Sequence, residues 1–203
     1  MRRRRARYIL AWPLAAWLVL LSGPASAQAG DQIVFLGDSL TAAGRWSEMF
    51  GDERLINQGV VGDTTALILK RLDSVLVSRP AKLFLMAGIN DLGAGVTVRV
   101  VATRYANIVR RVNRLSPETT IFVQSVLPVN KGLYPGSISN QDIKELNGKI
   151  KALAERYGAI YVDLFSLVAG RDGQLRPEFT SDGVHLKREA YLIWKSAIEE
   201  QVR

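Results

Sequence analysis

The fold is decided by the stretch Ile33-Val34-Phe35-Leu36-Gly37-Asp38-Ser39-Leu40-Thr41, in which an apolar run ends at a glycine. The apolar residues before Gly37 are typical of a short strand that is buried on both faces. Ser39 follows two residues later, where such a strand passes into a loop. A serine in this position is commonly a turn residue or a helix N-cap. It can also be a nucleophile, and a nucleophilic serine needs a base to activate it.

Similar apolar runs along the chain predict further strands. Together with the first, at Gln32–Leu36, they make five, the others being Arg54–Asn57, Lys82–Met86, Thr120–Gln124 and Ile160–Val162. Four of the five are continuous runs of Val, Ile, Leu or Phe type, which is typical of parallel strands covered on both faces. Arg54–Asn57 is the least apolar, so we expect it near an edge of the sheet.

Amphipathic segments separate the predicted strands. Apolar residues recur with helical spacing over 98–115 and 143–157, a shorter helix is expected around 68–75, and a last one begins near Lys187. This alternation predicts an α/β fold, with a doubly wound parallel sheet and helices on both faces. Ligands bind beyond the carboxyl ends of the strands in such sheets. The loops that follow the strands should therefore line one crevice.

The first 27 residues have the pattern of a secretory signal peptide. Arginines occupy positions 2–5 and 7, an apolar stretch of 14 residues covers 8–21, and Ala25-Ser26-Ala27 is a small-residue cleavage site. The apolar stretch is short for a membrane-spanning helix, which needs roughly 20 residues, so an uncleaved anchor is the less favoured alternative. We expect cleavage after Ala27, export to the periplasm or the extracellular space, and a single domain over 28–203.

The composition excludes several kinds of chemistry. The formal net charge is +8, but five arginines and no acidic residues lie before residue 28, which leaves +3 for residues 28–203. That charge is ordinary for a protein surface and argues against a nucleic-acid partner. The chain has no cysteine and one histidine, too few ligands for a typical zinc site. Calcium-loop and dinucleotide patterns are also missing, so we expect neither metal nor cofactor.

Polar segments follow several of the strands and should meet in the predicted crevice. Besides Gly37-Asp38-Ser39, they are Asn57–Thr64, Gly88–Asp91 and Ser181–His185. His185 is the only imidazole in the chain that could activate Ser39. Asp182 lies three residues before it, across a glycine, and one turn could hold its carboxylate against the ring. This combination matches the nucleophile, base and orienting acid of a serine hydrolase. The alternative is a surface histidine beside ordinary turn residues.

A hydrolytic serine also needs hydrogen-bond donors for the oxyanion that forms during the reaction. Asn90 offers a side-chain amide just past a strand end, and Gly62 offers a backbone N–H in a glycine-bracketed loop. Each of these is by itself a common turn residue. Their occurrence at strand ends together with Ser39, Asp182 and His185 favours a catalytic site.

Four blocks of the sequence resemble those of the SGNH/GDSL hydrolase family. They are Gly37-Asp38-Ser39-Leu40, Asn57–Gly62, Gly88–Asp91 and Asp182–His185. The resemblance implies a three-layer sandwich with a flavodoxin-like sheet, and a carboxylic ester hydrolase of GDSL type. It also implies a triad of Ser39, Asp182 and His185, with an oxyanion hole formed by Gly62, Asn90 and the Ser39 N–H. The G-x-S-x-G elbow of α/β-hydrolases is absent, because residue 41 is threonine.

Within that family, the segment Leu127-Pro128-Val129-Asn130 is most similar to acetylesterase-like and platelet-activating-factor acetylhydrolase-like members. We therefore expect short-chain, acetyl-type esters of small molecules, glycans or lipids as substrates. One alternative is a lysophospholipase, arylesterase or thioesterase with a longer acyl chain. Another is a non-catalytic carbohydrate- or lipid-binding module. Trp46 either walls the pocket or packs in the core, and the core is favoured. The sequence leaves the oligomeric state open.

Overall fold

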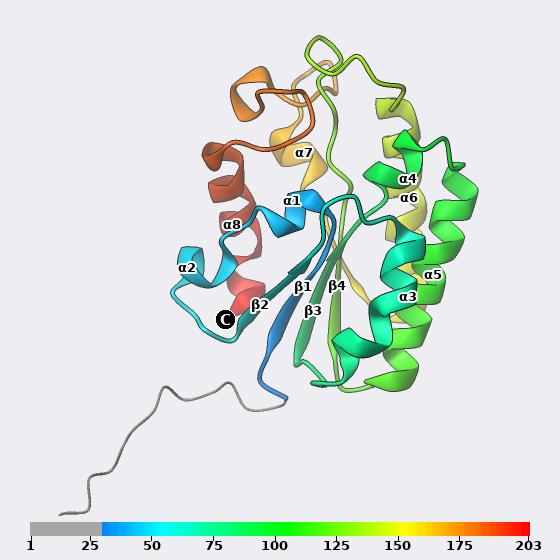
Figure 1. Cartoon of the computed structure of the whole chain (residues 1–203), viewed down its shortest axis with the longest axis vertical. Helices are drawn as coiled ribbons and strands as arrows, with labels where there is room; N and C mark the ends of the chain where they lie inside the picture. Colours follow the sequence, from blue (N-terminus) through cyan, green and yellow to red (C-terminus); the bar gives the residue numbers. More distant parts are fainter. Residues whose placement is uncertain (1–29) are drawn as a thin grey trace, which may run out of the picture.

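A parallel sheet of five strands forms the centre of residues 30–203, the part of the chain that the computed structural model describes (Figure 1). The strand order is β2-β1-β3-β4-β5, which is the doubly wound, flavodoxin-like order. All neighbouring strands are parallel, so the predicted fold class is confirmed. The bounds are Ile33–Gly37 for β1, Leu55–Gly59 for β2, Lys82–Met86 for β3, Thr120–Gln124 for β4 and Ile160–Val162 for β5.

The strands lie close to their predicted positions. β3, β4 and β5 have the predicted bounds, whereas β1 and β2 end later than predicted, at Gly37 and Gly59. These two glycines pair with each other across the neighbouring strands, so both belong to the ladder. β2 lies at one edge of the sheet, as its weaker apolar character predicted.

Side chains along β1 alternate between two helical layers. Val34 and Leu36 pack into one hydrophobic cluster and Ile33 and Phe35 into the other. This alternation follows from the twofold period of a strand, and burial on both faces accounts for the continuous apolar run. One layer contains α3 (Thr65–Leu76), α5 (Val98–Leu115) and α6 (Asn140–Tyr157), and the opposite layer contains α2 (Trp46–Phe50) and α8 (Arg188–Val202) (Figure 1).

An aromatic stack crosses the sheet on the α8 side. The ring of Phe35 stacks on Trp46 at 4.3 Å and on Phe84 at 4.8 Å between centroids, and Phe84 stacks on Phe122 at 4.5 Å. Trp46 is 1% exposed, so the expectation that it packs in the core is confirmed. Its indole N–H also donates to the Thr41 carbonyl at 2.9 Å. The stack therefore supports the segment that carries Ser39.

Short helices in the connections were not predicted, because they are too short to show a helical repeat. Two of them matter for the site: one begins right after Asp38 with Ser39, and another carries Asn90 just beyond β3. Both residues are thereby placed at the carboxyl edge of the sheet. The short elements other than α2 are α1 (Ser39–Ala42), α4 (Ile89–Gly93), α7 (Phe165–Val168) and the 3-10 helix η1 (Pro177–Phe179).

The N-terminal expectations fall outside the described residues. Residues 1–27, with the predicted signal peptide and its cleavage after Ala27, belong to the part of the chain for which no structure is described. Within residues 30–203, none of the helices has the length and apolar character needed to cross a membrane.

Candidate active site

A cleft of about 350 Å³ opens beside Ser39 at the carboxyl edge of the sheet. We call it the serine cleft. It brings together four residues that the sequence singled out, namely Ser39, Asn90, Asp182 and His185. Ile89, Gly93, Tyr134, Ile138 and Val184 complete its lining. The fifth predicted residue, Gly62, lies in the neighbouring loop after β2 and is not part of this lining.

Ser39, His185 and Asp182 form a continuous hydrogen-bonded chain. Ser39 Oγ lies 3.1 Å from His185 Nε2, and His185 Nδ1 lies 2.7 Å from Asp182 Oδ2. The second carboxylate oxygen of Asp182 accepts the backbone N–H groups of Val184 at 2.9 Å and His185 at 2.8 Å. The carboxylate is thus fixed by the backbone of the same turn that presents the imidazole.

The charge of Asp182 sets the tautomer of His185. Burial opposes ionisation of this carboxyl, but hydrogen bonds from the His185 ring and from the Val184 and His185 amides outweigh it and lower the pKa of Asp182 to about 2. An ionised carboxylate can only accept hydrogen bonds. His185 Nδ1 must therefore carry the proton, which leaves Nε2 free to accept the proton of the Ser39 hydroxyl.

The turn that carries Asp182 and His185 is held by neighbouring loops. Thr180 Oγ1 accepts the Gly183 N–H at 2.9 Å, and the Gly183 carbonyl accepts the Asn130 N–H at 2.8 Å. Gly183 has a φ of +87°, and a Cβ at this position would lie 2.6 Å from the Asn130 carbonyl oxygen. Only glycine suits this conformation and this contact, which explains the glycine between the predicted acid and base.

Ser39 is positioned as the first residue of α1. The Asp38 carboxyl caps this helix by accepting the Leu40 N–H at 3.0 Å. At and just beyond the C-terminal end of the helix, the Asn57 amide donates to the carbonyls of Thr41 at 3.1 Å and Gly44 at 2.8 Å. Gly59 also lies against α1, since a Cβ there would be 2.2 Å from the Ala42 nitrogen. The block Asn57–Gly62 therefore holds the helix that begins with the serine.

Burial of Asp38 makes the stability of the fold depend on pH. Burial raises the pKa of Asp38 to about 7 from its ordinary value of 3.8, against the opposing effects of the Leu40 N–H and of His185. Between these two pH values the folded chain holds a proton that the unfolded chain releases. Raising the pH through this window therefore favours unfolding. The contribution that protonated Asp38 makes to the stability of the fold is present at low pH and is lost by about pH 7.

We expect Asp38→Asn to flatten this dependence. Asparagine has nearly the same shape, caps helices well and does not titrate. Between pH 5 and 7 the wild type should lose up to about 3 kcal/mol more of its unfolding free energy than the variant. Urea unfolding at pH 5, 6, 7 and 8 measures this difference. Parallel curves for the two proteins would show that Asp38 does not titrate in this range.

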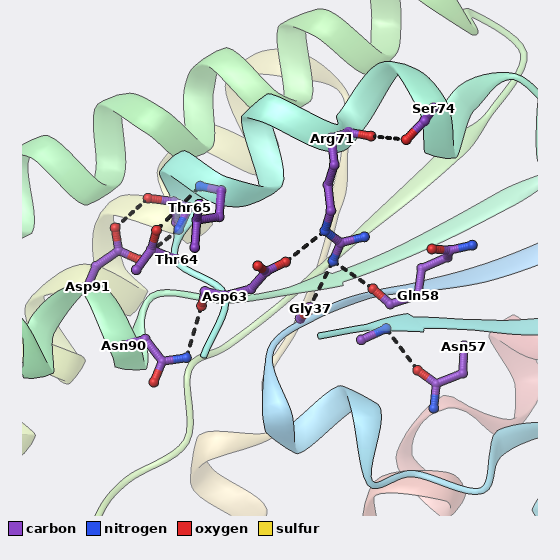
Figure 2. Close-up of polar contacts among 12 residues, drawn as sticks. Gly37, Asn57, Gln58, Asp63, Thr64, Thr65, Arg71, Ser74, Asn90 and Asp91 are labelled. Atoms are coloured by element: carbon purple, nitrogen blue, oxygen red, sulfur yellow. Dashed lines mark hydrogen bonds and ion pairs between the residues drawn. The ribbon is translucent and has the colours of Figure 1, made fainter. Parts of the chain in front are cut away.

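Three groups near Ser39 are candidate oxyanion donors, namely the Asn90 amide and the backbone N–H groups of Ser39 and Gly62. Asn90 Nδ2 donates to the Asp63 carbonyl at 2.9 Å, which orients its amide (Figure 2). Within residues 30–203, the backbone N–H groups of Ser39 and Gly62 have no hydrogen-bond acceptor. All three groups that the family resemblance implied for the oxyanion hole are therefore able to donate.

Comparison with known proteins identifies the family. Residues 35–193 match the model of the GDSL-like lipase/acylhydrolase family. The chain belongs to this family. It is therefore a GDSL-type carboxylic ester hydrolase.

Individual relatives of this acylhydrolase include eukaryotic and bacterial proteins. Platelet-activating factor acetylhydrolase IB subunit alpha1 of Pongo abelii is 30% identical over 168 residues, covering 79% of this chain and 70% of the relative. A solved structure from Streptococcus pneumonia, provisionally described as a platelet activating factor, is 31% identical in sequence and has a TM-score of 0.79. The match covers 86% of this chain and 85% of the chain in that structure. The structure of a GDSL-like lipase from Bacteroides thetaiotaomicron is 26% identical with a TM-score of 0.74, and the match covers 85% of this chain and 87% of that chain.

Some contacts around the site of this acylhydrolase were not predicted from the sequence. Arg71 of α3 pairs with Asp63 at 2.7 Å, and Asp91 accepts the Thr65 N–H and hydroxyl at 2.7 Å each. A signal for Arg71 does exist in the sequence. It lies three residues after Ile68 and four before Val75, so a charged residue occurs on the apolar side of an amphipathic helix.

The described residues hold no group of three or more His, Cys, Asp or Glu side chains arranged to bind a metal ion. The carboxylates near the cleft have other partners instead. Asp63 pairs with Arg71, Asp91 pairs with Arg104 at 3.0 Å, and Asp182 holds His185. These three acids thus each pair with a basic side chain of the protein.

Proposed function

We propose that this acylhydrolase cleaves carboxylic esters by nucleophilic attack of Ser39, with His185 as general base and Asp182 as the acid that orients it. The observation that carries the proposal is the hydrogen-bonded chain from Ser39 Oγ through the His185 ring to Asp182. All three of these residues line the serine cleft, from which an ester can reach the Ser39 hydroxyl. The tautomer set by Asp182 is the one that general-base catalysis requires.

The reaction has two half-reactions. In the first, Ser39 Oγ attacks the ester carbonyl carbon while His185 Nε2 takes the hydroxyl proton. The tetrahedral intermediate collapses, the C–O bond to the alcohol breaks, and the alcohol leaves with the proton from His185. In the second, water attacks the acyl-enzyme with His185 again as base, which releases the acid and regenerates Ser39. Asp182 stabilises the imidazolium in both steps.

We assign the oxyanion hole to the Asn90 amide and to the N–H groups of Gly62 and Ser39. Preorganised donors stabilise the negative oxygen more in the transition state than in the ground state, so they lower the barrier to the chemical step. The Asn90 amide has two N–H groups. One donates to Asp63 O, and the other remains for the oxyanion.

Asn90→Ala should lower kcat by roughly 10²- to 10³-fold, the usual loss for one oxyanion donor. KM should change little, because the lost hydrogen bond forms mainly in the transition state. Steady-state kinetics with p-nitrophenyl acetate measure both constants. Asn113→Ala is a suitable control, since Asn113 lies on α5 and its amide donates to Tyr157 O at 2.9 Å. A kcat within threefold of the wild type would remove Asn90 from the oxyanion hole.

We propose short-chain acyl groups, acetyl above all, as the preferred substrates. The serine cleft, at about 350 Å³, is at the small end of the range for ligand sites, roughly 300–1,000 Å³. The residues that line it include the apolar Ile89 and Ile138, both of which are buried. Acetylhydrolases among the relatives also support a small acyl group.

A chain-length series of p-nitrophenyl esters tests the acyl preference. We expect kcat/KM to be highest for acetate and to fall steadily from C4 onward, since a longer chain must leave the cleft. The alternative is a lysophospholipase, arylesterase or thioesterase with a wider acyl site, and an optimum at C8 or above would establish it. Family membership argues against a non-catalytic binding module.

We also propose that the protein is exported, which rests on the basic, apolar and small-residue regions within residues 1–27. The N-terminus of the protein recovered from the periplasm or the medium should then be Gln28. Recovery of the full-length chain from the membrane fraction would favour an uncleaved anchor instead.

A further inference from the structure

Arg71 extends from α3 to the carboxyl ends of β1 and β2, where it reaches three acceptors (Figure 2). Its Nε donates to Asp63 Oδ2 at 2.7 Å, and its Nη2 donates to Gln58 O at 2.8 Å and to Gly37 O at 3.3 Å. The side chains of Arg71 and Asp63 are only 21% and 6% exposed. A planar guanidinium fixes several acceptors at defined angles, which a lysine ammonium cannot do.

The acceptors of Arg71 lie next to the groups assigned to the oxyanion hole. Gly37 is two residues before Ser39 and also accepts the Val60 N–H at 3.0 Å. Asp63 directly follows Gly62, and its N–H closes a turn on Val60 O at 3.1 Å. The guanidinium of Arg71 therefore links the end of β1, just before Ser39, to the loop that carries the Gly62 N–H.

The Asn90 amide, another of the assigned oxyanion donors, also depends on the loop after β2, because it donates to the backbone carbonyl of Asp63. The carbonyl of Asp63 accepts the Asn90 Nδ2 hydrogen bond at 2.9 Å, while the carboxylate of Asp63 pairs with Arg71. A carbonyl can only accept, so this contact decides which end of the Asn90 amide is the nitrogen. If the loop moves, the direction of the Asn90 N–H moves with it.

We propose that Arg71 is a positioning residue for the oxyanion hole, acting mainly by holding Asp63 so that its carbonyl orients the Asn90 amide. The inference rests on the proposed function, since it assigns no new reaction. Arg71 touches none of the reacting groups. Its effect is to keep the donors in the geometry of the transition state, where a displacement of about 1 Å can cost on the order of 10² in rate.

The test compares Arg71→Met and Arg71→Lys with the wild type on p-nitrophenyl acetate. Methionine keeps much of the aliphatic part of the side chain but has no guanidinium. Lysine keeps the positive charge but lacks the planar set of N–H donors that holds several acceptors at once. We expect kcat to fall roughly 10- to 100-fold in both variants, with KM within about threefold because ground-state binding does not use the oxyanion donors. Wild-type kcat in Arg71→Lys, or a loss confined to KM, would overturn the proposal, even if Arg71→Met fails to fold.

Arg111→Met is the matched control. Arg111 of α5 also forms a pair with an aspartate, with its Nε 2.6 Å from Asp73 Oδ1, but neither residue lines the serine cleft. This variant should keep wild-type kcat. If it lost as much kcat as Arg71→Met at equal melting temperature, the effect of Arg71 would be that of any lost ion pair, and the proposal would be wrong.

A double-mutant cycle tests the route through Asn90. If Arg71 acts by orienting that amide, Arg71→Met should cost at most about threefold in an Asn90→Ala background, because coupled residues are not additive. The same factor in both backgrounds would overturn this route. The proposed nucleophilic attack by Ser39 is tested separately, because activity in Ser39→Ala would refute it without any change at Arg71. Loss of activity in Ser39→Ala and Asn90→Ala with a fully active Arg71→Met would overturn the present inference alone.

Discussion

Ser39→Ala should lower kcat by a factor on the order of 10⁶, leaving only the residual rate that binding and the oxyanion donors provide. The reason is that no other group lies within hydrogen-bonding distance of His185 Nε2 among the described residues. Without the hydroxyl, an ester in the cleft has no nucleophile except water, and water is not held in position by the imidazole. The acyl-enzyme cannot form, so the two-step route is lost.

The fold should tolerate this change. The only side-chain hydrogen bond of Ser39 within residues 30–203 is the one to the partly exposed His185 ring, so its loss leaves no buried polar group unsatisfied. We expect the melting temperature to stay within a few degrees of the wild type. Kinetics with p-nitrophenyl acetate and labelling by a fluorophosphonate probe measure the loss, with Ser47→Ala of α2 as the control. Full labelling and turnover in purified Ser39→Ala would refute the mechanism.

Asp182→Asn should lower kcat on the order of 10⁴-fold while keeping the structure. The Asp182 oxygen that accepts the Val184 and His185 amides can be replaced by the amide oxygen of asparagine. The amide nitrogen then faces His185 Nδ1. It can only donate there, so Nδ1 loses its proton and Nε2 gains one. In this tautomer Nε2 cannot accept the Ser39 proton.

A matched control for this variant is Asp172→Asn. Asp172 Oδ1 also accepts a backbone N–H two residues on, from Gln174 at 3.1 Å, but it is not part of the serine cleft. It should leave kcat unchanged. Equal melting temperatures for the two variants, with a large loss only in Asp182→Asn, would support the tautomer argument. More than a tenth of wild-type kcat in Asp182→Asn would contradict it.

The elements with a clear repeat were predictable because their burial pattern is local. The apolar stripe over 98–115 marks α5 from end to end, and the continuous apolar run of β3 marks a strand covered on both faces. The ends of β1 and β2 were placed too early, since Gly37 and Gly59 are in the sheet through pairing with each other. A glycine has no side chain by which a pattern could reveal that pairing.

The candidate site was predictable to the extent that its residues are rare or follow strands. His185 stood out as the only histidine, and Asp182 by its spacing from it. Arg71 was missed because the chain has 27 basic residues, so a single arginine does not stand out by its residue type. Its place on the apolar side of α3 was the one available signal.

The sequence by itself determined the strands, the longer helices and the polar loops that follow each strand, because hydrophobic periodicity and turn chemistry act over a few residues. Only the tertiary structure decided the distances. Ser39 and His185 are 146 positions apart, and their 3.1 Å contact depends on strand order and on how the last loop returns over α1. The orientation of Asn90 by a loop that Arg71 holds depends on packing between separate elements, which no local pattern records.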